Sequence, residues 1–299
     1  MKITKSFLLL LTFTSITFSQ FNKPSLQIGI GIAEPFGDMK GTYYRYITLP
    51  STGFQYIAAD TNLYTNNYGA KTGLTFYGLG KINFDKYSVS RGVIGISFST
   101  FNAFEPRKNG NIGKLFQNPN TGQIDTVPVG ANFSYTFNTF SFSLGLELAP
   151  LSFTDKVSPY FGARFSFNGF NSKLSYTSNN IDTTVFSADD FRMGVIFDAG
   201  IEMKFSKVIG LVVGANYNLG NLLLKSTSNS INDNYEWGKT NASINDEEGQ
   251  FWSSIYNPVI NSINKLYSSK QKNINWASFY LGINIYFNTG KTTKKAPKK

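Results

Sequence analysis

The fold is decided by a stretch in which every second side chain is apolar: Phe140-Ser141-Phe142-Ser143-Leu144-Gly145-Leu146-Glu147-Leu148. Successive side chains of a β-strand point to opposite faces, so a period of two places the Phe and Leu side chains on one face. The serines, the glycine and the glutamate share the other face. We therefore expect a strand that separates an apolar environment from a polar one along its whole length.

The same alternation recurs along the chain and predicts eight strands. The runs are 25–33, 73–84, 88–104, 133–148, 159–168, 194–205, 209–219 and 276–287. In the longest run, Phe133, Tyr135 and Phe137 have the opposite parity to Phe140. We expect a β-bulge near Asn138 to reconcile the two halves, since a bulge inserts one extra residue into a strand.

The connections between these runs alternate in length. Short connections follow the second, fourth and sixth runs, at 85–87, 149–158 and 206–208, and long ones lie at 34–72, 105–132, 169–193 and 220–275. Transmembrane barrels have short periplasmic turns at one end and long outer loops at the other. We therefore expect an all-β, antiparallel up-and-down transmembrane β-barrel of about eight strands. A secreted soluble β-sandwich that acts as a binding module is the alternative.

The composition agrees with lipid-facing strands and removes most catalytic chemistry. Charged residues make up 15% of the chain, against about 25% in soluble domains, and aromatic residues make up 16%. The sequence contains no histidine and no cysteine. Their absence excludes Ser-His-Asp and Cys-His catalysis and the commonest metal ligands. We therefore expect no enzyme activity, no cofactor and no metal.

The expected outer loops contain two further signals. Asp189 and Asp190 are adjacent, and Asp246 is followed by Glu247 and Glu248. Neither group lies in an apolar surrounding or matches a calcium-binding loop, so we interpret both as solvated loop charges. In the last loop, apolar side chains at a period of 3.6 predict a helix over residues 255–266.

The two ends of the chain differ from the rest. Residues 1–20 place two lysines before a short apolar stretch and end in small and polar residues, which is the plan of a cleavable signal peptide. Residues 288–299 hold five lysines and no acid, and we expect a disordered basic tail. Removing these seven charges from the net charge of +10 leaves +3 for the predicted barrel, residues 21–287. The high pI therefore indicates no nucleic-acid partner.

Charged residues on the polar faces predict a network inside the barrel. A barrel of about eight strands is just wide enough for side chains to fill it, and unpaired buried charge is costly. The charges of this parity on three consecutive runs are Glu147, Arg164, Asp198, Glu202 and Lys204. We expect them to pair as a structural network, and a small channel lined by them is the alternative. Aromatic residues near the ends of the runs are expected to lie in girdles at the two membrane interfaces. These residues are Phe84, Tyr87, Tyr160, Phe205 and Phe287.

Two segments resemble a known group of proteins, namely Val157-Ser158-Pro159-Tyr160-Phe161-Gly162-Ala163 and Phe279-Tyr280-Leu281-Gly282-Ile283-Asn284-Ile285-Tyr286-Phe287. With the signal and the all-β pattern, they look like the outer-membrane β-barrel domains of Bacteroidetes, including PorT-like and OmpA- or OmpX-like small barrels. The resemblance implies a membrane scaffold or interaction protein in the outer membrane of a Gram-negative bacterium. It allows a role in a secretion or surface-assembly machine. The implied partners are outer-membrane lipid, other envelope proteins and cell-surface polysaccharide.

Overall fold

The computed structural model describes residues 22–48, 55–59, 64–85, 89–117, 124–150, 156–227, 243–253 and 265–287. No helix within these ranges is both long enough and apolar enough to cross a membrane. The expected signal peptide, residues 1–20, and the expected basic tail, residues 288–299, lie outside the described residues.

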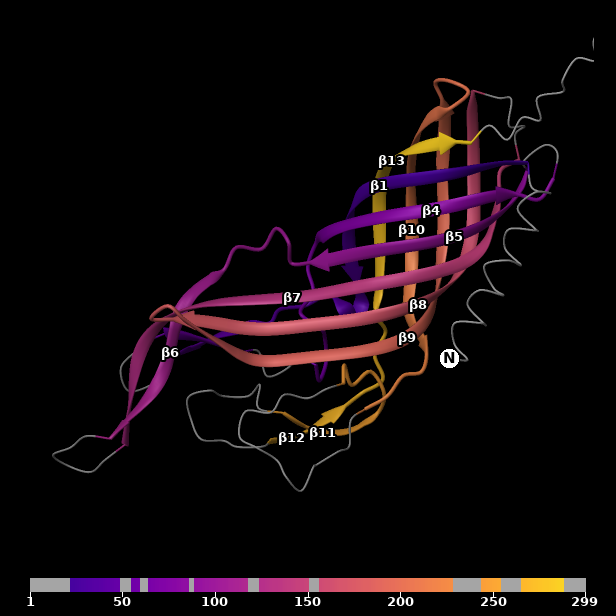
Figure 1. Ribbon diagram of the computed structural model, residues 1–299. Helices are drawn as coiled ribbons and strands as arrows, with labels where there is room; N and C mark the ends of the chain where they lie inside the picture. Colours follow the sequence, from indigo (N-terminus) through magenta and orange to yellow (C-terminus); the bar gives the residue numbers. More distant parts are fainter. Residues whose placement is uncertain are drawn as a thin grey trace, which may run out of the picture.

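Eight strands close on themselves into an antiparallel barrel (Figure 1). They are β1 (Asn22–Phe36), β4 (Gly73–Asn83), β5 (Ser90–Phe101), β7 (Ile124–Leu148), β8 (Val157–Ser178), β9 (Ile181–Lys204), β10 (Ile209–Leu223) and β13 (Asn275–Tyr286). Each pairs with the barrel strand before it and the one after it, and β13 pairs with β1 to complete the ring. The expected up-and-down barrel is therefore confirmed. A β-sandwich is excluded, because it consists of two packed sheets rather than one closed sheet.

The two ends of the barrel differ as the connection lengths predict. Short connections join β4 to β5, β7 to β8 and β9 to β10 at one end, which we call the short-turn end. At that end the backbone N–H of Phe287 donates to the carbonyl oxygen of Pro24 at 2.9 Å, so the first and last barrel strands meet there. The long connections lie at the opposite end, which we call the mouth.

The outer face of the barrel is apolar and exposed. Every barrel strand contributes to this apolar band, which includes Ile30, Phe76, Ile96, Phe140, Phe161, Phe197, Val213 and Leu281. Residues 140–148 of β7 run about 27 Å along the strand at ~3.4 Å per residue. A tilt of about 40° reduces this to a height of about 21 Å, close to the ~25 Å apolar band of transmembrane barrels. The inner-face residues Ser141, Ser143 and Glu147 are buried.

The expected β-bulge near Asn138 is not formed. Both the β5–β7 and the β7–β8 registers run unbroken through this position. Phe133, Tyr135 and Phe137 therefore stay on the inner face, where they are buried. The inner face of β7 changes in chemistry and not in parity, because the strand leaves the polar barrel interior and enters an aromatic cluster at the mouth.

The long connections contain strands where the sequence predicts loops. The hairpin of β8 and β9 continues to Ser178 and Ile181, and residues 124–133 of β7 pair with β6 (Lys108–Gln117). Figure 1 shows these strands running on past the barrel. The first long connection contains η1 (Gly37–Met39), β2 (Tyr44–Thr48) and β3 (Gln55–Ala59), and the last contains β11 (Gly249–Ser253) and β12 (Lys265–Ser269).

The prediction of a helix over residues 255–266 is wrong for the two of these residues that the structure describes. Its last two residues, Lys265 and Leu266, begin strand β12, which pairs with β11. The other predicted helical residues lie outside the described residues.

Glycines on the inner face make room for one large side chain. Gly29 of β1 lies directly opposite Gly282 of β13, and a Cβ atom on either would collide with the Tyr77 hydroxyl. That hydroxyl accepts a hydrogen bond from Gln27 Nε2 at 3.1 Å, and the Tyr77 ring lies 4.8 Å from the ring of Tyr280. Small and large side chains thus fill the barrel interior together.

Candidate functional site

Four buried charged side chains form a network near the short-turn end. Lys81 of β4 and Arg91 of β5 face Glu147 of β7 and Glu202 of β9. Lys81 Nζ lies 2.8 Å from Glu147 Oε2 and 2.9 Å from Glu202 Oε1. Arg91 Nη1 lies 2.9 Å from Glu147 Oε1 and 2.8 Å from Glu202 Oε1. Each cation therefore contacts both carboxylates, and the charges balance in a site where no side chain is more than 4% exposed.

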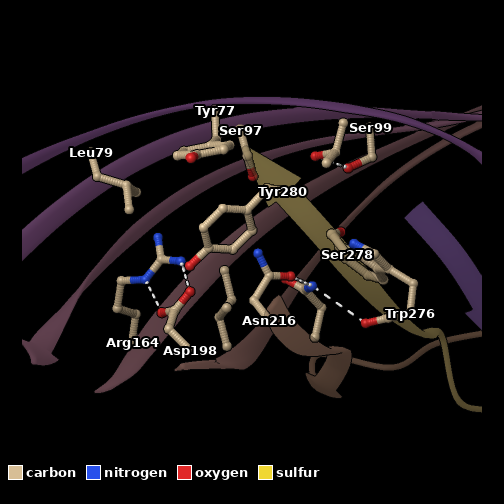
Figure 2. Close-up of a pocket in the computed structure, with 13 residues that line it drawn as sticks. Tyr77, Leu79, Ser97, Ser99, Arg164, Asp198, Asn216, Trp276, Ser278 and Tyr280 are labelled. Carbon is tan, nitrogen blue, oxygen red and sulfur yellow. Dashed lines mark hydrogen bonds and ion pairs between the residues drawn. The ribbon is translucent and has the colours of Figure 1, made fainter. Parts of the chain in front are cut away.

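A separate ion pair lies further towards the mouth. Arg164 donates from Nε to Asp198 Oδ2 at 2.7 Å and from Nη2 to Asp198 Oδ1 at 2.8 Å. Its Nη1 donates to Ser143 Oγ at 2.8 Å. This two-bond geometry is the strong form of an arginine–carboxylate contact. Figure 2 shows the pair beside Tyr280, with Trp276 further along the interior.

Little space remains between these side chains. The interior cavity lined by Arg164, Asp198, Asn216, Trp276 and Tyr280 has a volume of about 10 Å³ (Figure 2). This is at the lower limit for holding one water molecule. The part of the interior that surrounds the Arg164–Asp198 pair is therefore packed.

The structure divides the five predicted network residues. Glu147 and Glu202 belong to the four-charge network, and Arg164 pairs with Asp198. Lys204 lies at the last residue of β9, where its Nζ is 5.8 Å from the centre of the Tyr286 ring. Four of the five predicted residues therefore belong to two separate groups of ion pairs, and Lys204 lies beside Tyr286 instead.

Sequence reasoning missed both cations of the four-charge network. Lys81 has the parity of Thr75 and Asn83 in the run 73–84, so it lies on the polar face of that run. Arg91 has the parity of Gly95 and Ser97, so it also lies on the inner face. Parity alone could have found both residues, but the closure that brings β4 and β5 towards β9 is a tertiary property.

The expected place of Tyr160 in an interfacial girdle is wrong. Its side chain points inward and is 3% exposed. Its ring lies 4.3 Å from Lys81 Nζ, and its hydroxyl lies 2.7 Å from the Tyr280 hydroxyl. Of the other expected girdle residues, Phe84, Phe205 and Phe287 are exposed at the short-turn end, and Tyr87 lies outside the described residues.

An aromatic cluster closes the mouth. Tyr43 and Tyr68, from the connection between β1 and β4, pack against side chains that rise from the barrel strands. The ring of Tyr43 stacks on Tyr135 at 5.3 Å, and the ring of Tyr68 lies 5.7 Å from Phe137. The Tyr135 hydroxyl donates to the carbonyl oxygen of Tyr68 at 2.7 Å. The described residues of the first long connection that belong to this cluster therefore cover the inner face at the mouth, and we call them the mouth plug.

Two of the acids interpreted as solvated loop charges are bound to an arginine. Arg192 Nη2 donates to Asp246 Oδ1 and to Asp190 Oδ2, both at 2.7 Å, and Arg192 is 2% exposed. Asp246 is fully buried, so the interpretation of its carboxylate as a solvated loop charge is wrong. The sequence pattern did not predict this pairing because Asp246 lies 54 residues from Arg192. The other acids of the two groups, Asp189, Glu247 and Glu248, are exposed.

A buried lysine joins the first and the last of the four long connections at the mouth. Lys272 Nζ donates to the carbonyl oxygens of Tyr64 at 2.8 Å and Asn245 at 2.5 Å, and it lies 3.0 Å from Ser269 Oγ. Burial lowers the pKa of Lys272 to about 8, against the opposing effect of the negative charges on Asp246 and Asp38. Lys272 therefore cross-links the mouth plug to the last long connection through backbone carbonyls.

No protein-family model matches this chain, and no curated protein matches it either. Among solved structures, the chain is similar to Neisserial surface protein A, with 11% identity, 88% of this chain and 97% of that chain covered, and a TM-score of 0.39. It is also similar to Ail, the attachment invasion locus protein of Yersinia pestis, with 10% identity, 89% and 99% covered, and a TM-score of 0.34. A structure of Ail in complex with the heparin analogue sucrose octasulfate has 11% identity, the same coverage and a TM-score of 0.36.

The buried charges of this chain fit a packing role. Within the ranges that the structure describes, no group of three or more His, Cys, Asp or Glu side chains is placed to hold a metal ion. The buried carboxylates of Glu147, Glu202, Asp198 and Asp246 each contact a lysine or an arginine.

Proposed function

We propose that this chain is a non-enzymatic outer-membrane barrel of a Gram-negative bacterium that acts as a membrane scaffold or interaction protein. The observation that carries the proposal is a closed barrel that is apolar outside and packed with polar and aromatic side chains inside. In hydrocarbon every backbone N–H and C=O must pair within the protein, and a closed sheet satisfies this condition. Its exposed apolar band has members on all eight barrel strands, whereas soluble monomers rarely expose large contiguous apolar patches.

The packed interior favours a scaffold over the alternative of a small channel. The four-charge network obstructs the short-turn end, the Arg164–Asp198 pair lies next along the axis, and the plug closes the mouth. Moving ions through this path would require breaking buried ion pairs, which is strongly unfavourable. In planar bilayers we expect no stepwise conductance from the folded protein. Stable single-channel steps would overturn the scaffold proposal in favour of the channel.

The strands beyond the apolar band offer surfaces for interaction. The β8–β9 hairpin and the β6–β7 pair extend past the barrel at the mouth (Figure 1). In the proposed orientation the short turns face the periplasm, so these strands stand outside the cell. We propose that they contact other envelope proteins or cell-surface polysaccharide, and that the partner assembly is a secretion or surface-assembly machine of the Bacteroidetes PorT-like kind.

Location and orientation can be tested on intact cells. Folded barrels migrate differently before and after boiling in gel electrophoresis, and we expect such a shift from the outer-membrane fraction. Added protease should cut a tag inserted between Thr227 and Ser243, which join β10 to β11, and should spare an epitope at Lys299. Loss of the epitope from intact cells would refute the orientation. Absence of the gel shift would refute the membrane barrel itself.

The partner proposal needs its own experiment. The full-length protein is purified from native membranes after crosslinking, alongside a variant that lacks residues 108–132, which contain β6 and its paired segment of β7. Envelope proteins recovered with the full chain and lost with the variant would support assembly through this extension. Recovery of the same proteins by both forms would contradict it, provided that both forms show the gel shift.

A further inference from the structure

A groove lies on the outer surface of the barrel, on the side formed by β5, β7, β8 and β9. One register row crosses these strands through Phe98, Phe140, Gly169 and Phe191. The three phenylalanines are 42%, 56% and 48% exposed. Because Gly169 has no side chain, the row has a gap between two phenyl rings, and the groove there has a volume of about 520 Å³. This is within the ~300–1,000 Å³ range of ligand pockets.

The next outward-facing row towards the mouth is polar. It contains Asn138, Asn171 and Asp189, which are register partners on β7, β8 and β9 and also line the groove. Asn171 Nδ2 donates to Asp189 Oδ1 at 2.6 Å, and Asn138 Nδ2 lies 3.5 Å from Asn171 Oδ1. The chain of amides thus ends on an exposed carboxylate, which accepts further hydrogen bonds.

The apolar row and the polar row together are complementary to an amphiphile that lies along the strands. Its chain would fill the gap at Gly169 and continue into the apolar band, and its headgroup would lie over Asn138, Asn171 and Asp189. The headgroup must offer hydrogen-bond donors, since the row ends on a carboxylate, and a phosphate at the same place would be repelled. Sugar hydroxyls meet both conditions.

We propose that this groove binds one acyl chain of an outer-leaflet glycolipid, whose sugar hydroxyls donate to Asp189 and its neighbouring amides. The inference rests on the proposed membrane location, because the groove is continuous with the apolar band and lies at its mouth-side edge. The phenyl rings of Phe140 and Phe191 form the two walls, and the site holds one chain because Gly169 is the one gap in this register row.

The groove can be filled without disturbing the fold. A Cβ atom at Gly169 would meet the carbonyl oxygen of Phe140 at 3.8 Å and nothing nearer, which is ordinary contact. Gly169→Leu should therefore fold and occupy the gap. Asp189→Ala removes the acceptor at the end of the polar row and leaves the apolar gap unchanged.

The experiment uses fluorescence quenching by brominated lipids in phosphatidylcholine vesicles. Because the chain has no cysteine, Ile96→Cys and Leu281→Cys each give one attachment point for a bimane label. Both side chains face outward and are similarly exposed, at 54% for Ile96 and 52% for Leu281. Ile96 lies on β5, one outward-facing row from the groove towards the short-turn end. Leu281 lies on β13 and is the matched control. The probes are a glucosyl diacylglycerol and a phosphatidylcholine, both with brominated chains. Phosphatidylcholine has no headgroup donors.

We expect the glucosyl lipid to quench the Ile96 label with about a tenfold preference over the Leu281 label, equivalent to about 1.4 kcal/mol. Gly169→Leu should abolish this preference, and Asp189→Ala should reduce it. Brominated phosphatidylcholine should quench both labels alike.

Equal quenching of both labels by both lipids would overturn the groove as a site. A preference at Ile96 that is the same for both lipids would overturn the headgroup assignment. A Leu281 label that no brominated lipid quenches would refute the membrane location instead, so the two failures are distinguishable.

Discussion

Removing one charge from the four-charge network should destabilise the barrel more than removing a matched pair. Glu202 Oε1 accepts from both Lys81 Nζ and Arg91 Nη1. Glu202→Gln keeps the shape of the side chain and removes its charge. Two cations then face a single carboxylate, that of Glu147, so one positive charge is uncompensated in a site that is at most 4% exposed.

The expected cost follows from this imbalance. Removing one partner of a buried pair destabilises by about 3–5 kcal/mol, and the lost charge of Glu202 pairs with two cations here, so we expect the upper part of that range. Lys81→Met should cost a similar amount, because it leaves two carboxylates facing Arg91. The double variant restores neutrality and keeps the Arg91–Glu147 contact at 2.9 Å. Replacing a whole buried pair is often neutral, so the double variant should lie within about 2 kcal/mol of the wild type.

The assay is reversible urea unfolding of the barrel reconstituted in lipid vesicles, with both single variants and the double variant measured together. The double variant should be more stable than either single variant. Gel mobility before and after boiling verifies that each variant forms the barrel. If the losses of unfolding free energy in the two single variants simply add in the double variant, the charges do not act as a network.

Three further predictions concern the outer face, the glycines and the mouth. Val213→Arg should cost about 2–4 kcal/mol of unfolding free energy in vesicles, whereas Val213→Leu should be nearly neutral; equal costs would refute lipid contact at this position. Gly282→Ala should lower the unfolding free energy by about 1–3 kcal/mol, because its added Cβ collides with Tyr77. The control is Gly78→Ala, which should leave the unfolding free energy nearly unchanged because its added Cβ meets only Ile96 Cγ1, at 3.7 Å. The pKa of Lys272 in the folded state is about 8, below the ordinary lysine value of 10.5, so the folded state releases its proton at a lower pH than the unfolded state does. The cost of burying this charge is fully present below pH 8 and declines as the pH rises towards 10.5, so the unfolding free energy should rise over that interval. Lys272→Met should lose this part of the pH dependence, and identical pH profiles would contradict the assignment.

The sequence by itself determined the strands and their two faces. Side-chain period is a local property of an extended backbone, so the alternation in residues 140–148 assigned lipid-side and inner-side residues without knowledge of the partners. The same reasoning placed Glu147, Arg164, Asp198 and Glu202 on the inner face, where they are buried. The alternating connection lengths then predicted closure and the common end of the short turns.

Only the tertiary structure decided which inner residues meet and where the barrel interior ends. Closure brings Lys81 within 2.9 Å of Glu202, 121 residues away, and no local pattern records such a distance. The bulge expected near Asn138 was wrong because inner-face aromatics are stabilised by the connection folded over the mouth, which sequence parity does not show. Asp246 was misinterpreted for a related reason: its partner Arg192 lies on β9, 54 residues earlier in the chain, and the two meet only through a tertiary contact at the mouth. A period reports the face on which a side chain lies, whereas its contacts depend on the closed three-dimensional arrangement of all eight strands.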